Sequence, residues 1–235
     1  MGRFTSFFGV IIAFMVLSTS CSNKDGVTIK VNVVSQDQNM LYFSRLDFKQ
    51  TVVLDSVKIS AGESTKKFKV KQGVEPTFYS IGIRNGGAIT LLAEQGEVIN
   101  VKFDSKAMLD YTVTGSIGSS KVQTLAVEFA KSKIKVDELR AKYVKSESEL
   151  EKARIEDEFE QTLKMQKEFN LKFIKENPMS KANVMAIYQK YNDNLFVFNT
   201  SEDLLTLKTV ASAWRALYPE SEYTKGMVDE IKRIE

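Results

Sequence analysis

The residue types that most often carry catalysis are scarce in this sequence. Its 235 residues include a single cysteine, Cys21, and no histidine. Histidine is the commonest general base and metal ligand, and it is the usual partner of a nucleophilic serine or cysteine. A single cysteine can form neither an intramolecular disulfide nor a CxxC redox pair. We therefore expect no enzymatic activity, no cofactor and no metal site, with a carboxylate-based hydrolase as the remaining enzymatic alternative.

A phosphate-binding loop is the nearest approach to a known cofactor motif. The segment TGSIGSSKV, residues 114–122, follows an expected strand and opens an expected helix. In the GxxxxGK[ST] pattern, however, Ser120 stands at the second glycine and Val122 replaces the hydroxyl that would hold magnesium. We interpret the segment as a helix start that is capped by Ser116, Ser119 or Ser120.

An acidic stretch offers the carboxylate pairs that glycosidases and metal sites use. It reads ESELEKARIEDEFE and covers residues 147–160. On a helix, glutamates of this stretch and of the flanking residues have lysines four positions later, so we expect solvated ion pairs instead of a catalytic or metal site. The expected pairs are Glu138 with Lys142, Glu160 with Lys164, and Glu168 with Lys172.

A row of lysines could bind an anionic partner. Lys67, Lys69 and Lys71 lie on the outer face of one expected strand, where they could attract an anionic glycan, a lipid headgroup or nucleic acid. Nucleic-acid surfaces also carry aromatic side chains that stack on bases, and none alternates with these lysines. We therefore expect a solvated edge strand that lysines protect from sheet-to-sheet pairing, and no nucleic-acid binding.

The first 20 residues have the layout of an export signal. Arg3 supplies a positive charge, residues 7–17 are an unbroken apolar run, and small hydroxyl residues follow. The run is too short for a membrane span, which needs about 20 residues. Small residues followed by Cys21 resemble the bacterial lipoprotein signal, although Leu17 stands four positions before the cysteine, one more than in the familiar pattern. The resemblance implies that Cys21 carries diacylglycerol as the mature N-terminus. The alternative is ordinary cleavage that leaves a free cysteine.

The residues after Cys21 suggest a tether and a location. The segment of residues 21–26 is short and polar, and it lacks the run of acidic residues that sends some lipoproteins to the cell surface. We therefore expect an outer-membrane lipoprotein whose anchor is membrane lipid. The periplasmic face is favoured over the cell surface.

Alternating apolar residues predict short β-strands between residues 27 and 115. In residues 27–33, valine and isoleucine alternate with polar side chains, which gives one buried face and one wet face. Further strands are expected within residues 66–72, 78–83, 97–103 and 111–115. Asn85-Gly86 and Gln95-Gly96 lie between such runs and predict hairpin turns. We expect an antiparallel sandwich or open barrel of about seven to eight strands.

From residue 116 onward the apolar residues follow a helical period. Two long amphipathic helices are expected to form a hairpin that breaks near residues 146–148. Ser180, Ser201 and Ser221 are expected to cap three shorter helices, and Trp214 is expected to be a core residue. The predicted fold class is α+β, with a sandwich domain at 27–115 and an all-helical domain at 116–235.

The order and spacing of several strand motifs resemble a known domain. The motifs are VVLDSVKIS (52–60), FKVKQGVEPTFYSIGI (68–83), ITLLAEQGEVINVKFD (89–104) and YTVTGS (111–116). They are similar to the N-terminal domain of unknown function that many envelope lipoproteins carry ahead of a thioredoxin-like thiol-disulfide oxidoreductase domain. Residues 173–183 and 217–223 resemble the helical connector of the same proteins.

The resemblance implies two candidate functions. In those proteins a thioredoxin-like domain with a CxxC motif follows the connector, whereas this sequence ends at Glu235, so we do not expect the redox activity to carry over. The first candidate is a non-catalytic, lipid-anchored module that binds an envelope protein or a small ligand. The alternative is an accessory or truncated member of a thiol-disulfide exchange system, which presents substrates to a separate thioredoxin-like protein. Asp55-Ser56-Val57 also resembles a short O-glycosylation acceptor of such lineages, which implies a sugar on Ser56.

Overall fold

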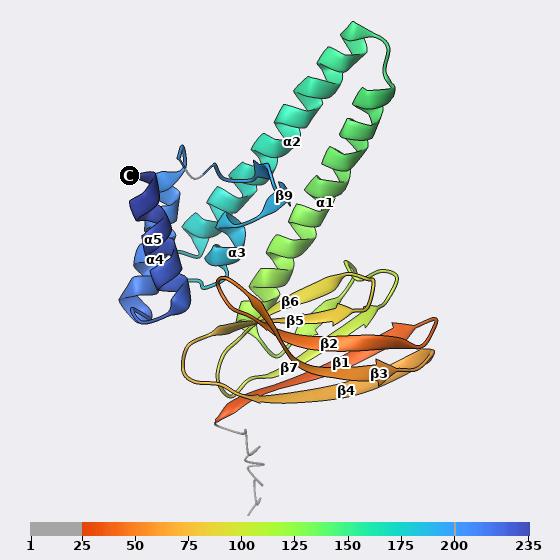
Figure 1. Cartoon of the computed structure of the whole chain (residues 1–235), viewed down its shortest axis with the longest axis vertical. Coiled ribbons are helices and arrows are strands. Elements are labelled where there is room, and N and C mark those ends of the chain that lie inside the picture. Colours follow the sequence, from red (N-terminus) through yellow and green to blue (C-terminus); the bar gives the residue numbers. More distant parts are fainter. Residues whose placement is uncertain (1–24, 200) are drawn as a thin grey trace, which may run out of the picture.

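The computed structural model describes residues 25–199 and 201–235, and it has the predicted α+β layout (Figure 1). Eight strands form two four-stranded sheets, with the orders β4-β1-β7-β8 and β3-β2-β5-β6. Their bounds are β1 Gly26–Ser35, β2 Asn39–Leu46, β3 Thr51–Ile59, β4 Gly62–Lys71, β5 Thr77–Ile83, β6 Ala88–Ala93, β7 Val98–Asp104 and β8 Thr112–Thr114. The two sheets pack against each other as a sandwich.

The sandwich core comes from the alternation that the sequence shows. Ile29, Val31 and Val33 of β1 are fully buried, because side chains two apart on a strand point to the same face. The Phe43 ring of β2 stacks across the core on Phe68 of β4, at 4.9 Å between ring centroids, and within its own sheet on Tyr79 of β5, at 5.2 Å. Such aromatic pairs contribute stability beyond the area that they bury.

The connections differ from the predicted antiparallel pattern in two places. Asn85-Gly86 does form a hairpin turn between the paired strands β5 and β6, and Asn85 has the positive φ of 57° that such turns favour. Gln95-Gly96 does not, because β6 and β7 belong to different sheets and the turn crosses between them. β7 then pairs with β1 in parallel.

The helical part begins with a long hairpin that projects from the sandwich (Figure 1). It consists of α1 (Ile117–Lys145) and α2 (Glu149–Glu176), with the break at residues 146–148 where the sequence predicts it. Three helices follow, α3 (Asn183–Ile187), α4 (Leu204–Leu217) and α5 (Glu222–Ile234). Figure 1 shows α3, α4 and α5 beside the lower part of the hairpin.

Two predictions about the helical part are wrong. It is not all-helical, because β9 (Lys190–Asn192) and β10 (Leu195–Phe196) form a small antiparallel ribbon. Ser180 and Ser201 are not the caps, since Ala182 precedes α3 and Asp203 precedes α4. Ser221 does cap α5, where its hydroxyl accepts a hydrogen bond from the Tyr223 amide.

The lysine-rich strand lies where the sequence predicts it, whereas the expected ion pairs do not form. β4 is an edge strand, and Lys67, Lys69 and Lys71 are exposed on its outer face. Within the described residues, the helix pairs at i,i+4 spacing run from lysine to a carboxylate four positions later. They are Lys133 with Asp137, Lys164 with Glu168, and Lys172 with Glu176, at 3.0, 4.0 and 3.9 Å. None of the described helices is long and apolar enough to cross a membrane.

Candidate functional site

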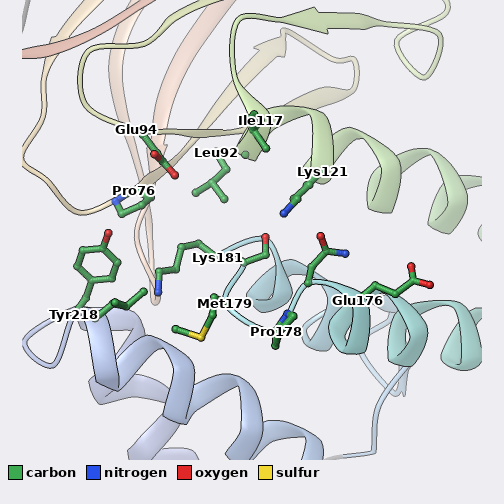
Figure 2. A pocket seen from close by; sticks show the side chains of 14 residues that line it. Pro76, Leu92, Glu94, Ile117, Lys121, Glu176, Pro178, Met179, Lys181 and Tyr218 are labelled. Carbon is green, nitrogen blue, oxygen red and sulfur yellow. The ribbon is translucent and has the colours of Figure 1, made fainter.

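A pocket of about 420 Å³ lies where the sandwich meets the helices (Figure 2). Its walls come from the residue before β5, the end of β6, the first turn of α1, the connection from α2 to α3, and the end of α4. The lining residues used below are Pro76, Leu92, Glu94, Gly118, Lys121, Glu176, Asn177, Lys181 and Tyr218. The volume is within the range of small-molecule sites, about 300–1,000 Å³.

The first turn of α1 is fixed to the edge of the second sheet. β6 is an edge strand, so the outward backbone groups of Leu92 have no strand partner. The hydroxyls of Ser116 and Ser119 both donate to the Leu92 carbonyl, at 3.1 and 2.9 Å, and the Leu92 amide donates to the Ser119 hydroxyl at 3.1 Å. Ser116 also caps α1, as one of the three predicted serines. The serines of the phosphate-loop-like segment therefore hold the helix to the sheet.

Gly118 allows this close approach. A Cβ atom at this position would lie 2.9 Å from the Leu92 carbonyl oxygen. A larger residue would push α1 away from β6 and open the pocket wall. The presence of a glycine inside the phosphate-loop-like segment, at Gly118, is thus explained by helix-to-strand packing.

The connection from α2 to α3 turns Lys181 back into the pocket. The Asn177 side chain donates to the Phe173 carbonyl at 2.9 Å, beside its own backbone amide, which donates to the same carbonyl at 3.0 Å. The Asn183 side chain in turn donates to the Asn177 carbonyl at 2.8 Å. These bonds tie both ends of the short connection together and fix the position from which Lys181 extends.

Lys181 is the most unusual side chain of the pocket. It is only 5% exposed, and its amine has no hydrogen-bond partner among the described residues. The Nζ atom lies 4.9 Å from the centroid of the Trp214 ring and 4.6 Å from that of Tyr218, which is cation–π geometry. Figure 2 shows the side chain crossing the pocket toward Tyr218, with Pro76 and Glu94 on the sandwich side.

Burial lowers the pKa of the Lys181 amine to about 8, although the nearby carboxylates of Glu75 and Glu94 oppose the shift. The loss of hydration disfavours the charged form, and neither carboxylate is close enough to replace the lost hydrogen bonds. The same surroundings raise the pKa of the Tyr218 hydroxyl, chiefly through burial. The amine is therefore cationic at neutral pH but short of partners.

Two carboxylates and two amines line the pocket, so their formal charges balance. Lys121 extends from α1 on one side, while Glu94 and Glu176 come from the sandwich and the end of α2 (Figure 2). Among the described residues, only Glu176 of these four has an ion pair, a 3.9 Å contact with Lys172. The pocket can therefore offer both cationic and anionic groups to a ligand.

The residues singled out from the sequence lie elsewhere. Cys21 is outside the described residues. Ser56 is exposed on β3, the edge strand of the second sheet, and its amide donates to the Asp55 carboxylate at 2.7 Å. Glycosylation of Ser56 stays a prediction that intact-mass analysis of protein from the native host would test. In the described part of the chain, no group of three or more cysteine, aspartate or glutamate residues could hold a metal ion.

Comparison with protein families matches residues 27–121 to a family described as Domain of unknown function (DUF4369). The match confirms the resemblance to a domain of unknown function, and it covers the sandwich and the first turn of α1. Pro76, Leu92, Glu94 and Lys121 lie inside the match, whereas the opposite wall with Lys181 lies outside it. Comparison with curated proteins finds no match.

Proposed function

We propose that this chain is a non-catalytic, lipid-anchored binding module of the cell envelope. Its ligand would occupy the pocket between the sandwich and the helices, and its anchor would hold it at the periplasmic face of the outer membrane. The observation that carries the proposal is the buried amine of Lys181, which lines a pocket of suitable size and lacks hydrogen-bond partners among the described residues.

The charges of the pocket favour a small zwitterion, such as a free amino acid or a short peptide. A ligand carboxylate would give Lys181 the hydrogen bonds that it lacks, with Lys121 adding a second positive charge. A phosphate dianion fits less well, because Glu94 and Glu176 would repel its second charge. The same two carboxylates suit the ammonium group of a zwitterion.

The proposal is tested by titrating the isotopically labelled full chain with a dipeptide, alanyl-alanine, while backbone amide signals are followed by NMR. We expect shifts that cluster on the first turn of α1, residues 177–181 and Tyr218. The same dipeptide with an acetylated N-terminus and an amidated C-terminus has no charges, and it should cause no such shifts. Lys181→Met should abolish the response.

Lys175→Met is the matched control, since Lys175 is an exposed lysine of the last turn of α2 that does not line the pocket. It should leave the response intact. Equal responses to the charged and blocked dipeptides, no response at all, or a response that survives Lys181→Met would contradict the proposal.

The second candidate is an accessory role in thiol-disulfide exchange beside a thioredoxin-like protein. It is supported by the family match at residues 27–121 together with the resemblance of the sequence to the modules that precede such domains. The two candidates differ in partner. Capture of a thioredoxin-like protein from the native envelope, lost when its active-site cysteines are replaced, would support the accessory role. In either role we expect the chain alone not to reduce insulin, and measurable turnover would argue for an enzyme.

A further inference from the structure

An apolar groove runs along one side of the distal half of the α1–α2 hairpin. It has a volume of about 710 Å³ and is lined by Leu139, Arg140, Tyr143, Val144, Ile155, Glu156, Phe159, Glu160 and Leu163. Val144 is 84% exposed and Tyr143 is 37% exposed, so apolar surface of the groove faces solvent. Figure 1 shows the distal hairpin extending beyond α3, α4 and α5, which leaves it accessible to a partner.

The rim of this groove carries opposite charges on its two sides. Arg140 of α1 lies over the Phe159 ring, 5.7 Å from its centroid, while Glu156 and Glu160 line the α2 side. None of these three residues forms an ion pair within the described part of the chain. Unpaired charges of opposite sign beside an exposed apolar centre are typical of a surface that recognises a complementary one.

The two helices differ in charge over the whole distal half. Residues 131–145 of α1 include six basic and two acidic side chains, whereas residues 149–160 of α2 include two basic and six acidic ones. A surface that is basic on one side and acidic on the other complements its own copy when the copy is rotated by half a turn about an axis parallel to the helices. In that arrangement each α1 faces the α2 of the partner.

We propose that the groove is the interface of a homodimer, in which the hairpins of two copies pack in parallel as a four-helix bundle. The interface buries Tyr143 and Val144 at its centre and brings Arg140 of each copy to Glu160 of the other. The alternative rotation, about an axis across the helices, would oppose α1 to α1 and place like charges together. The parallel arrangement also places the N-termini of both copies on the same side, as the proposed anchoring of both copies in one membrane requires.

A charge-exchange experiment tests this pairing on the full chain, with mass measured by sedimentation in density-matched detergent. Arg140→Glu alone and Glu160→Arg alone should each raise the dimer dissociation constant by at least about tenfold, because each homodimer then contains two like-charged contacts. A mixture of the two variants should form a heterodimer with nearly wild-type affinity, because both contacts regain opposite charges. In a dimer that paired α1 with α1, each single variant would replace one like-charged contact with another and would not weaken the dimer, whereas the mixture would bind more tightly than the wild type.

Two further variants separate the interface from folding. Arg154→Glu makes the same charge change on the opposite side of α2 and should leave the dimer unchanged. Val144→Glu should weaken the dimer without changing the circular dichroism of the monomer, because Val144 makes little contact within the chain. A monomeric wild-type chain throughout the micromolar range, or a mixture of the two charge variants that stays monomeric, would overturn the proposal.

Discussion

The buried amine of Lys181 makes the stability of the fold depend on pH. Folding removes its hydration and lowers its pKa from 10.5 to about 8, chiefly through burial. Between these two pH values the unfolded chain holds the proton more tightly than the folded chain does, so the free energy of unfolding rises as the pH increases. Below about pH 8 both states are protonated, and the full cost of burying the charge remains.

Lys181→Met should remove this pH dependence. We expect the wild type to gain about 2 kcal/mol relative to the variant between about pH 8 and pH 10. Urea denaturation of both proteins across this range measures the difference. Tyr111 and Tyr223, whose pKa values are raised by burial, reduce stability at higher pH, but they are common to both proteins and cancel in the comparison. Parallel stability curves would show that the amine is not desolvated.

Single residues were predictable from the sequence where local chemistry determines their role. Ser116 and Ser221 cap helices as expected, and Trp214 is fully buried on its apolar helix face. Lys181 could not be found in this way, because in the local sequence it is an ordinary lysine after a proline turn. It becomes unusual only when Trp214 and Tyr218, more than thirty positions later, pack around its amine.

At the scale of elements, α5 packs against the β2–β3 turn through a contact that requires glycine. A Cβ atom on Gly226 would lie 2.1 Å from the Phe48 ring. Gly226→Ala should therefore destabilise the fold by about 1–3 kcal/mol, because the ring or the helix must move. At an exposed helix position, replacing glycine by alanine would instead stabilise the protein by up to about 1 kcal/mol. Whether Gly226→Ala raises or lowers the stability therefore tells whether Phe48 packs against this position. Thermal unfolding measures it.

Gly73→Ala is the control for that experiment. Nothing lies within 4 Å of a Cβ atom at Gly73, so this variant should unfold close to the wild type. If Gly226→Ala were as stable as the wild type or more so, α5 could not be packed on Phe48 as the structure shows.

The elements themselves were predictable to different degrees. The long helices and the strands of residues 27–115 show clear periods, because one face of each is buried along its whole length. The β9–β10 ribbon was missed because strands of two or three residues are too short to show an alternation. The parallel pairing of β1 with β7 depends on which sheet each strand joins, and no local pattern encodes that choice.

At the scale of the whole molecule, a shared apolar core joins the sandwich to the helical part. Phe78 and Leu92 of the sandwich pack with Val122 of α1 and Trp214 of α4. The pocket lies at this junction, so its shape depends on both parts being folded together. A ligand that binds there would stabilise the junction by mass action.

Membrane association is the prediction that concerns the molecule as a whole. Cys21 precedes β1 by five positions, and a tether of this length reaches at most about 20 Å when fully extended. Two acyl chains on Cys21 would give stable anchoring, whereas a single chain binds only marginally.

Cys21→Ala should therefore move the protein from the membrane fraction of the native host to the soluble fraction. Fractionation with immunodetection measures the shift, and mass spectrometry of the wild-type N-terminal peptide should show the added lipid. A variant that stays in the membrane fraction, or a wild-type peptide with an unmodified cysteine, would mean that the anchor is not at Cys21.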